Sequence, residues 1–447
     1  MEKKSFYKSF FAMYVVLVLQ NVISLSVNLA DNLMLGSYSE IALSGVAAVN
    51  QIQFVYQQLL TAVGDGLVIL CSQYWGKKQT EPMRKIAATA MRTALAIAVI
   101  LFVFVSLFPG KAMSFFTTDA AIAQQGMIYI RTIRFTYVFF AVTMILLASM
   151  RSVETVNIAF YLSVSTLVIN CCINYTLIFG HFGAPQLGVT GAAIGTLTAR
   201  IVECAAVIFY VWKKDKKLNL RMSDYLHRDR ILGRDYFRVS LPMMFIQSLW
   251  GLNNALQTAI LGHMTSIAIA ANSVASTLFL VVKSTAVGAA STASVIIGKA
   301  VGVGDMDVVR KYAVRLQKMF LVIGVISGIL LFFLRIPILS LYDLSPETRE
   351  MANAFLIILS VVCMTMSYQM PVNNGLIRGG GNPMFVVKMD LISIWGIVIP
   401  LSLIMAFVIK ASPVVVVCCL NADQVFKCVP AFLEVNYGHW ARKLTRN

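Results

Sequence analysis

The sequence predicts an all-α, polytopic membrane protein with about twelve transmembrane helices in two pseudo-symmetric six-helix lobes. Three observations predict this class. Of the 447 residues, 58% are hydrophobic and only 13% are charged, roughly half the charged fraction of a soluble domain. Apolar segments near the ~20 residues that cross a bilayer core recur along the whole chain. The most basic stretch lies midway between two sets of these segments.

The twelve predicted spans follow one another along almost the entire chain. Their approximate bounds are 11–35, 46–72, 86–108, 127–149, 158–179, 189–212, 240–262, 273–298, 313–334, 352–375, 385–408 and 414–437. The last span is the least regular, because Asp423, Lys427 and Glu434 interrupt it. The basic N-terminus leads into an apolar run that is longer than that of a signal peptide, so we expect the first helix to be retained.

The basic stretch Lys213 to Arg238 separates the sixth span from the seventh. Short loops rich in Lys and Arg stay on the cytoplasmic side of a membrane. We therefore expect a cytoplasmic connector, 213–238, between an N-terminal lobe, 1–212, and a C-terminal lobe, 239–447. Alternate loops carry the same bias, since Lys77 and Arg151 lie in loops of one set and the loops after spans 1, 5 and 7 hold no Lys or Arg. Both termini are predicted to be cytoplasmic.

The two halves of the chain repeat one pattern at an offset of 226 residues. The matching pairs are Gly36 and Gly262, Ala42 and Ala268, Gly76 and Gly302, Arg84 and Arg310, and Lys85 and Lys311. Because six is an even number of spans, both halves enter the membrane from the same side and are related by an axis along the membrane normal. This arrangement favours a substrate path between the lobes near mid-membrane and transport by alternating access.

Composition also excludes several classes of function. The net charge is +17, but the basic residues lie between hydrophobic runs, which is not the pattern of a nucleic-acid-binding protein. The eight Cys residues form no CxxC pair, and the four His residues show no ligand spacing, so no metal site is expected beyond possible Na⁺. The patch Gly379 to Gly381 follows a membrane helix rather than a strand, so a phosphate loop is not expected. We predict no enzyme activity and no bound cofactor.

Polar residues inside the spans are the candidate functional residues, because such groups are costly in a bilayer. Asp31 lies about one turn before the end of the first span, where it can bind a cation or proton or lie exposed among the headgroups. The second span carries a polar stripe, whose members recur every three or four residues and share one helix face: Asn50, Gln53, Gln57, Thr61 and Asp65. This stripe is predicted to line a wet cavity or to pack on another polar helix. Asp65 is either a second titrating group or a hydrogen-bonded residue of the bundle.

Three further spans carry polar candidates. Asn170 and Asn174 share a face of the fifth span, where they can complete a cation shell or join helices by hydrogen bonds. The seventh span contains three amides: Gln247, Asn254 and Gln257. Lys388 and Asp390 lie near the cytoplasmic start of the eleventh span, and we interpret them as a pair that reaches toward the interface.

Five motifs resemble those of the multidrug and toxic compound extrusion (MATE) family. They are Asp31-Asn32-Leu33-Met34-Leu35-Gly36, Ser72-Gln73-Tyr74-Trp75-Gly76, Gly302-Val303-Gly304-Asp305, Arg378-Gly379-Gly380-Gly381-Asn382, and Ile392-Ser393-Ile394-Trp395 leading to Pro400. The resemblance runs over nearly the whole chain and is weakest in the last span. It implies a cation-coupled antiporter, driven by Na⁺ or H⁺, that expels organic cations and drugs through a pair of six-helix lobes.

Carried over residue by residue, the resemblance places an ion-coupling site in the N-terminal lobe, at Asp31, Asn170, Asn174 and Thr196. Some family members have a carboxylate at the position of Asn174, so Asp31 is the only acid of this site here. Many members carry a functional Glu in the seventh span, and Gln247 takes its place. A neutral amide cannot take up and release a proton, so we expect coupling in the N-terminal lobe.

The resemblance also implies a bacterial cell membrane as the location, and we expect a monomer whose partners are organic cations or drugs and the lipid bilayer. One alternative is a flippase for lipid-linked sugars, but such a protein lines its cavity with several Arg and Lys, and here these gather in loops and at helix ends. A second is a membrane-embedded enzyme such as an acyltransferase, which needs paired His, Asp or Ser residues facing one cavity.

Overall fold

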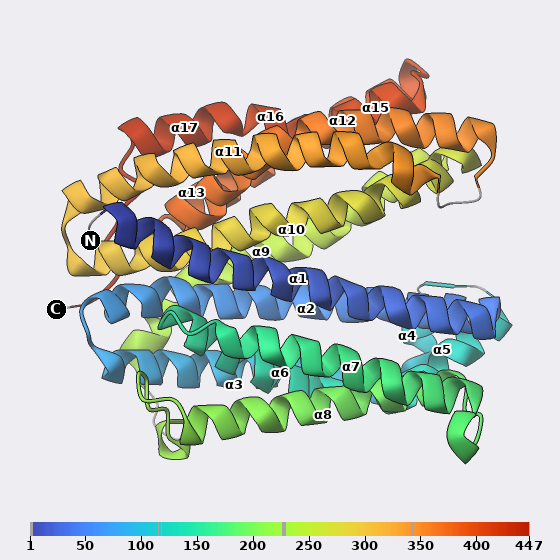
Figure 1. The fold of residues 1–447 in the computed structure, drawn as a ribbon, viewed down its shortest axis with the longest axis horizontal. Coiled ribbons are helices and arrows are strands. Elements are labelled where there is room, and N and C mark those ends of the chain that lie inside the picture. Colours follow the sequence, from blue (N-terminus) through green and yellow to red (C-terminus); the bar gives the residue numbers. More distant parts are fainter. Residues whose placement is uncertain (1–2, 115, 118, 226–228, 341–343, 447) are drawn as a thin grey trace. The chain divides into compact units, whose positions relative to one another are not determined.

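The computed structural model describes residues 3–114, 116–117, 119–225, 229–340 and 344–446. Every regular element of this part of the chain is a helix (Figure 1). The chain forms two compact units. Unit 1 comprises Met1–Val18, Ser72–Lys78 and Phe245–Asn447, and unit 2 comprises Leu19–Cys71 and Gln79–Met244. The first part of α1 and the last part of α2 therefore cluster with the C-terminal half, and each unit is described by itself below.

Unit 2 is built from long helices joined by short connections. Its elements are most of α1 (Lys3–Tyr38) and α2 (Glu40–Gly76), then α3 (Thr80–Leu107), α4 (Pro109–Ser114), α5 (Ala120–Ile133), α6 (Thr136–Ser152), α7 (Asn157–Phe179), η1 (His181–Gly183), α8 (Val189–Lys213), η2 (Met222–Tyr225) and the start of α9 (Arg230–Gly262). The predicted span 127–149 is not straight, because α5 and α6 meet at a bend of 55°.

Helices α7 and α8 pack side by side (Figure 1). Glycines of α8 permit this approach. A Cβ on Gly191 would lie 2.7 Å from the carbonyl carbon of Leu177, and one on Gly195 would collide with the side-chain oxygen of Asn174. Real Cβ atoms do not come this close to backbone atoms, so only glycine lets the two helices pack at this distance. This close packing fixes the polar face of α7 relative to α8.

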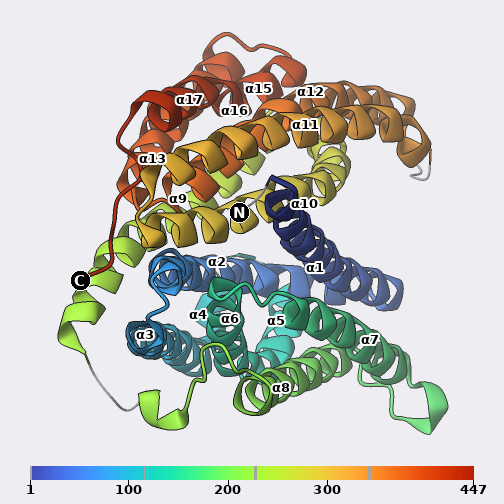
Figure 2. The same ribbon diagram turned by 60° about the vertical axis from the view of Figure 1, so that its left-hand side comes forward.

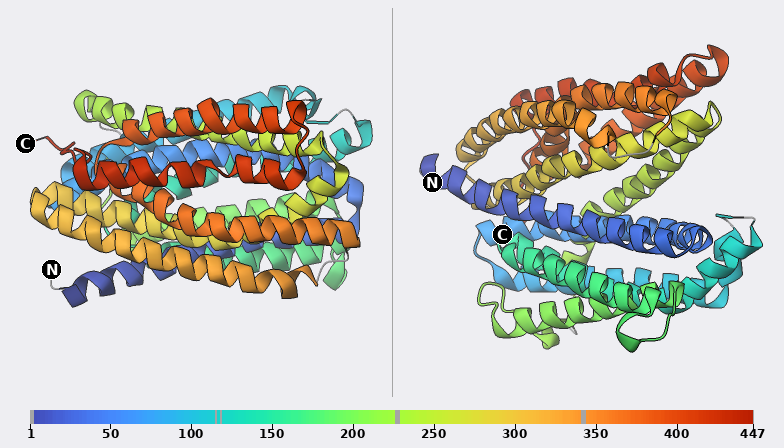
Figure 3. Two further views of the ribbon diagram at one scale, coloured as in Figure 1. Left: turned by 90° about the horizontal axis from the view of Figure 1, so that it is seen from above. Right: turned by 45° about the vertical axis from the view of Figure 1, so that its right-hand side comes forward.

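Unit 1 contains the rest of α9 and the C-terminal helices. These are α10 (Ser266–Val303), α11 (Met306–Leu339), α12 (Pro346–Met370), η3 (Pro371–Ile377), α13 (Pro383–Asp390), η4 (Leu391–Val398), α14 (Ile399–Leu403), η5 (Ile404–Val408), α15 (Pro413–Leu420), α16 (Asp423–Phe426) and α17 (Cys428–Tyr437). Elements η3, η4 and η5 are π-helical. Helices α11 and α12 lie next to each other along their length (Figure 2, Figure 3).

The sharp turn between α10 and α11 follows from two residues of one motif. Gly304 ends α10 with a φ of +93°, a left-handed conformation that glycine adopts without strain. Asp305 is the N-cap of α11, and its side chain accepts hydrogen bonds from the backbone N–H groups of Asp307 and Val308. An Asp at this position satisfies donors that the first helical turn leaves free.

The interior of unit 1 is apolar, and its outer surface is apolar as well. Phe355, Leu356 and Cys363 of α12 are fully buried in its core. On α11, Phe333 is 69% exposed and Val322 is 58% exposed. Water-soluble proteins rarely expose large apolar patches, whereas a lipid environment favours them.

Ten helices of the described residues are long and apolar enough to cross a membrane, or eleven if the bent pair α5 and α6 forms one span. The last two predicted spans are among them, as Pro383–Val408 and Pro413–Tyr437. Helix α9, which contains the predicted span 240–262, is not, although its 33 residues are long enough to cross a bilayer. Its sequence carries Gln247, Asn253, Asn254 and Gln257, and such polar groups lower the mean hydropathy of a segment.

Candidate functional site

The structure joins the four predicted residues of the N-terminal site in one hydrogen-bond network. Asn174 Nδ2 on α7 donates to Asp31 Oδ1 on α1 at 2.6 Å. The same nitrogen lies 3.3 Å from Asn170 Oδ1, and Asn170 Nδ2 donates to Thr196 Oγ1 on α8 at 3.2 Å. Three helices of unit 2 therefore converge on the single carboxylate of this network.

The Asn174 amide points its NH₂ group at Asp31. Its Oδ1 packs against Gly195 of α8, is buried and has no hydrogen-bond partner within the described residues. A buried acceptor without a donor costs about 1–3 kcal/mol. The hydrogen bond from the NH₂ group to Asp31 offsets this cost, and the donor stabilises the carboxylate when no cation is bound.

Two charged residues beside this network were not predicted from the sequence. Arg200 of α8 interacts electrostatically with Asp31, and its Nη1 donates to Glu203 Oε2 at 2.6 Å. The Arg200 guanidinium also lies 4.9 Å from the ring centre of Phe140. Thr196, Arg200 and Glu203 are spaced by four and three residues, so the rule that intramembrane charges mark functional sites could have identified them.

Tyr129 is a third residue that the sequence did not indicate. It lies on α5, is buried, and its side chain interacts with that of Thr196. It also interacts electrostatically with Asp31. Its helix, α5, precedes the 55° bend, which the straight span predicted at 127–149 did not anticipate.

Asp65 belongs to a different cluster. Arg151 Nη2 at the end of α6 donates to Asp65 Oδ1 at 2.9 Å, with the two side chains 23% and 16% exposed. Asp65 is thus hydrogen-bonded within unit 2. The other four members of the α2 stripe, Asn50, Gln53, Gln57 and Thr61, are all half-buried.

The candidates of α9 are also half-buried, at Gln247, Asn254 and Gln257. Gln257 Nε2 lies 3.3 Å from the Oδ1 of Asn253, a buried amide that the sequence did not single out.

The expected pair Lys388 and Asp390 is not formed. Lys388 is exposed, and Asp390 Oδ1 lies 2.7 Å from Lys427 Nζ instead. Residues two apart on a helix point in different directions, so Lys388 cannot reach Asp390 easily. Lys427 also contacts Asp423.

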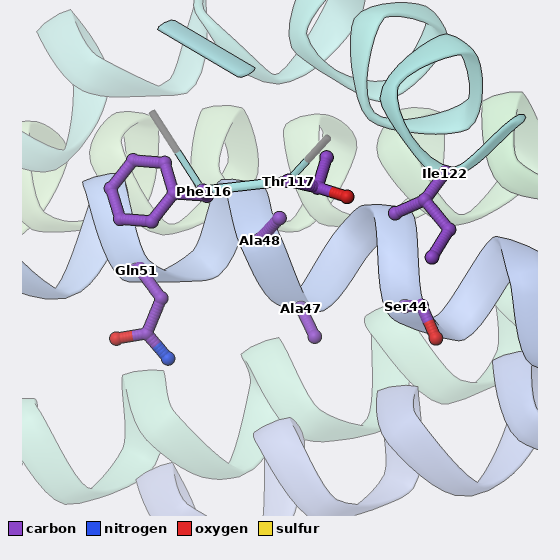
Figure 4. Close-up of a pocket in the computed structure, with 7 residues that line it drawn as sticks. All are labelled: Ser44, Ala47, Ala48, Gln51, Phe116, Thr117 and Ile122. Atoms are coloured by element: carbon purple, nitrogen blue, oxygen red, sulfur yellow. The ribbon is translucent and has the colours of Figure 1, made fainter. Parts of the chain in front are cut away.

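Unit 2 has an open surface pocket of about 390 Å³ at one end of α2. Figure 4 shows its lining, which comprises Ser44, Ala47, Ala48, Gln51, Phe116, Thr117 and Ile122. None of these seven residues belongs to the predicted stripe, since Ser44, Ala47 and Gln51 lie on another face of the helix. Within the described residues, no group of three or more His, Cys, Asp or Glu side chains could hold a metal ion.

Comparison with known proteins identifies the family. The MatE family model matches residues 17–176 and 242–404. The "Uncharacterized transporter YisQ" of Bacillus subtilis is 24% identical over 381 residues, which cover 83% of this chain and 82% of that protein. The "Probable multidrug resistance protein NorM" of Thermotoga maritima is 23% identical over 429 residues, or 96% of this chain and 92% of the relative.

Solved structures have the same fold. The eukaryotic MATE transporter AtDTX14 is 18% identical, with a TM-score of 0.85 over 97% of this chain and 96% of that one. A mutant of the Vibrio cholerae MATE transporter VcmN is 16% identical, with a TM-score of 0.86 over 99% and 98% of the two chains. Because the family model spans well over half of the sequence, this chain belongs to the MatE family and is a multi-pass membrane transporter, not an enzyme.

Proposed function

We propose that this transporter exports organic cations or drugs across the bacterial cell membrane in exchange for H⁺ or Na⁺, by alternating access. Relatives that are named as probable multidrug resistance proteins support the substrate class. The observation that carries the coupling step is the network around Asp31, because a lone carboxylate inside a membrane-spanning helix must gain a cation or a donor to be stable there.

Binding of a cation changes the charge of this site, and a change of charge can bias two conformations. With the carboxylate ionised, Asn174 donates to it and Arg200 partly balances its charge. With a proton or Na⁺ on Asp31, the Coulomb attraction to Arg200 falls and the pair of Arg200 with Glu203 becomes the dominant one. A ligand shifts a conformational equilibrium only by its difference in affinity for the two states, and this switch of partners provides such a difference.

The substrate would contact polar side chains set among apolar ones. The half-buried stripe of α2 and the amides of α9 are our candidates for these contacts. The chain also contains 22 Met residues, whose flexible side chains adapt to ligands of different shape. We expect the transporter to act as a monomer.

The test is efflux of ethidium from proteoliposomes under a Na⁺ gradient alone and under a pH gradient alone. We expect one of the gradients to drive efflux and Asp31→Asn to abolish this dependence. Glu40→Gln is the matched control, because Glu40 is an exposed carboxylate at the start of α2. Gradient-driven efflux by Asp31→Asn at the normal rate would refute the role of Asp31. Absence of efflux in the unaltered protein under either gradient would refute the function and make lipid flipping the next assay.

A further inference from the structure

Three charged side chains of unit 1 meet within membrane-spanning segments. Lys427 Nζ lies 2.7 Å from Asp390 Oδ1 and 2.9 Å from Asp423 Oδ2. Asp390 is in the span Pro383–Val408, and the other two are in the span Pro413–Tyr437. Ionisable groups at such positions are costly, and their default interpretation is functional.

The helices are irregular where these charges lie. Asp390 is the last residue of α13, after which the backbone becomes π-helical. Asp423 begins the single-turn helix α16, and Lys427 separates it from α17. π-Helical turns occur often at functional sites, and irregular backbone at membrane depth is tolerated where it is buried in protein or lines a wet cavity.

The two carboxylates are not equivalent. Asp423 is 7% exposed and its Oδ2 also accepts from Gln424 Nε2 at 2.8 Å. It lies four residues before Lys427, so their contact is local. Asp390 is 25% exposed, reaches Lys427 from another helix, and has Lys427 as its one ion-pair partner within the described residues. Asp390 is therefore the carboxylate that can lose Lys427 and meet another cation.

A chain of amides extends from Asp423 to a buried acceptor. Gln369 Nε2 donates to Gln424 Oε1 at 2.6 Å, and Asn373 Nδ2 donates to Gln369 Oε1 at 3.0 Å. Asn373 lies in the π-helix η3 and is 4% exposed. Its Oδ1 has no partner among the described residues. Buried polar atoms normally have partners, so this oxygen is a second polar group of the cluster that can receive a cation or a donor.

Lys283 of α10 completes the charge balance. It interacts electrostatically with Asp423, Lys427 and the thiol of Cys363, and its Nζ lies 4.7 Å from the ring centre of Trp250. The cluster thus contains two lysine side chains and two carboxylates. The cluster needs no added ion while Lys427 contacts both carboxylates.

We propose that Asp390 is a cation-exchange site in which Lys427 is a tethered competitor for the incoming ion. A monovalent cation binds Asp390 when Lys427 moves entirely to Asp423. This move leaves the Lys427 ammonium paired, whereas Asp390 would become an uncompensated, half-buried charge unless a cation replaced Lys427. When the ion is a proton, it comes from water, bonds to a carboxylate oxygen of Asp390 and returns to water on release.

Such a site would serve antiport directly, and in this respect the inference rests on the proposed function. A coupling ion and the cationic group of a substrate cannot occupy one carboxylate together, and mutual exclusion is what exchange requires. The shared chemistry is a single positive charge, which H⁺, Na⁺ or an organic cation can supply.

Four substitutions at the three charged residues should change ethidium binding in different directions. In purified full-length protein carrying Asp31→Asn, we expect Asp390→Asn to weaken ethidium binding at least about tenfold, which corresponds to roughly 1.4 kcal/mol. Asp423→Asn should weaken it less, because Lys427 then stays on Asp390. Lys427→Gln should strengthen it, because the competitor is gone, whereas Lys427→Arg should weaken it, because a guanidinium can hold both carboxylates.

A purely structural ion pair predicts another pattern, in which Lys427→Gln weakens binding and Lys427→Arg restores it. That result would overturn the proposal, and Lys427→Arg decides the matter if Lys427→Gln does not fold. Glu350→Gln, at an exposed carboxylate of α12, should match the parent. Fluorescence anisotropy gives the affinities.

Two further measurements identify which cation binds Asp390. Replacing KCl by NaCl at constant ionic strength tests Na⁺, and infrared difference spectra between pH 3 and pH 8, a range that includes the ordinary carboxyl value of about 3.9, test protonation of Asp390. If Asp390→Asn changes neither ethidium binding nor the carboxyl infrared band nor the effect of Na⁺, the site is refuted. Because these readouts measure binding, they remain decisive even if gradient-driven efflux fails.

Discussion

The Nδ2 of Asn174 lies 2.6 Å from the Oδ1 of Asp31, which joins α7 to α1 through the only carboxylate of the network. Asn174 can take this position because the residue opposite its amide oxygen is Gly195. The neighbouring Arg200 and Glu203 add one cation and one anion. The ion chemistry of the site therefore depends on a glycine contact as much as on the charged groups, and this can be tested.

Gly195→Ala should uncouple transport without removing any polar group. The new methyl group would collide with the Asn174 amide and push it away from Asp31. We expect a loss of about 1–3 kcal/mol of stability, typical of overpacking, and weaker gradient-driven ethidium efflux. Thermal unfolding and proteoliposome efflux measure the two effects. Gly183→Ala, in the connection between α7 and α8, is a control glycine change without a clash, since nothing lies within 4 Å of its Cβ position, although its φ of +78° adds local strain. Normal efflux by Gly195→Ala would contradict the role of the amide.

Arg200→Gln should increase the affinity of the coupling cation for Asp31. Removal of a positive charge that interacts with Asp31 removes repulsion of the incoming cation. We expect a change on the order of tenfold, because such interactions are worth one to a few kcal/mol. The half-maximal point of efflux should move to lower Na⁺ concentration or to higher pH. Arg200→Lys keeps the charge and should leave this midpoint near that of the unaltered protein. Equal midpoints for all three proteins would contradict the argument.

Part of this site could be predicted from the sequence, for a physical reason. Asn170 and Asn174 are one helical turn apart, and polar groups inside an apolar span must meet other polar groups. The pairing of Asp390 with Lys427 was not predictable in the same way, because it joins two different spans. The sequence neighbour Lys388 was the expected partner, but residues two apart on a helix diverge.

The membrane spans also have features that the sequence predicts and features that it does not. Hydropathy predicts where Pro383–Val408 and Pro413–Tyr437 begin and end within a few residues. It does not predict the π-helical turns at η3 and η4 or the bend between α5 and α6. Such breaks depend on hydrogen bonds and packing with other helices and have little signature in local composition.

Gln73→Ala should destabilise unit 1 at its C-terminal segment. The Gln73 side chain is buried, and it donates from Nε2 to the carbonyl of Arg442 at 3.1 Å and accepts from the N–H of Leu444 at 2.8 Å. Loss of both partners leaves two backbone groups of the segment unsatisfied, which costs about 1–3 kcal/mol for each group that stays buried. We expect a lower midpoint of thermal unfolding and faster proteolysis after residue 440. Gln73→Glu keeps the size and the acceptor but loses the donor, so it should be destabilised too. An unchanged midpoint for both variants would contradict this role.

Acidification should destabilise the start of α9 through Asp229. Asp229 Oδ1 accepts from the N–H groups of Ile231 and Leu232 at 3.0 and 3.1 Å, and its Oδ2 lies 3.7 Å from Lys85 Nζ. These backbone hydrogen bonds, followed by Lys85, lower the pKa of Asp229. A carboxyl whose pKa is lower in the folded state contributes stability above its unfolded value of about 3.9, and this contribution is lost as the pH falls through the folded value.

Asp229→Ala should cost about 0.5–2 kcal/mol at neutral pH, as for other N-terminal helix caps. The difference between Asp229→Ala and the unaltered protein should shrink below pH 4, where protonation removes the same contribution. Thermal unfolding from pH 7 to pH 3 measures this difference, and a constant difference over that range would show that the charge of Asp229 does not matter.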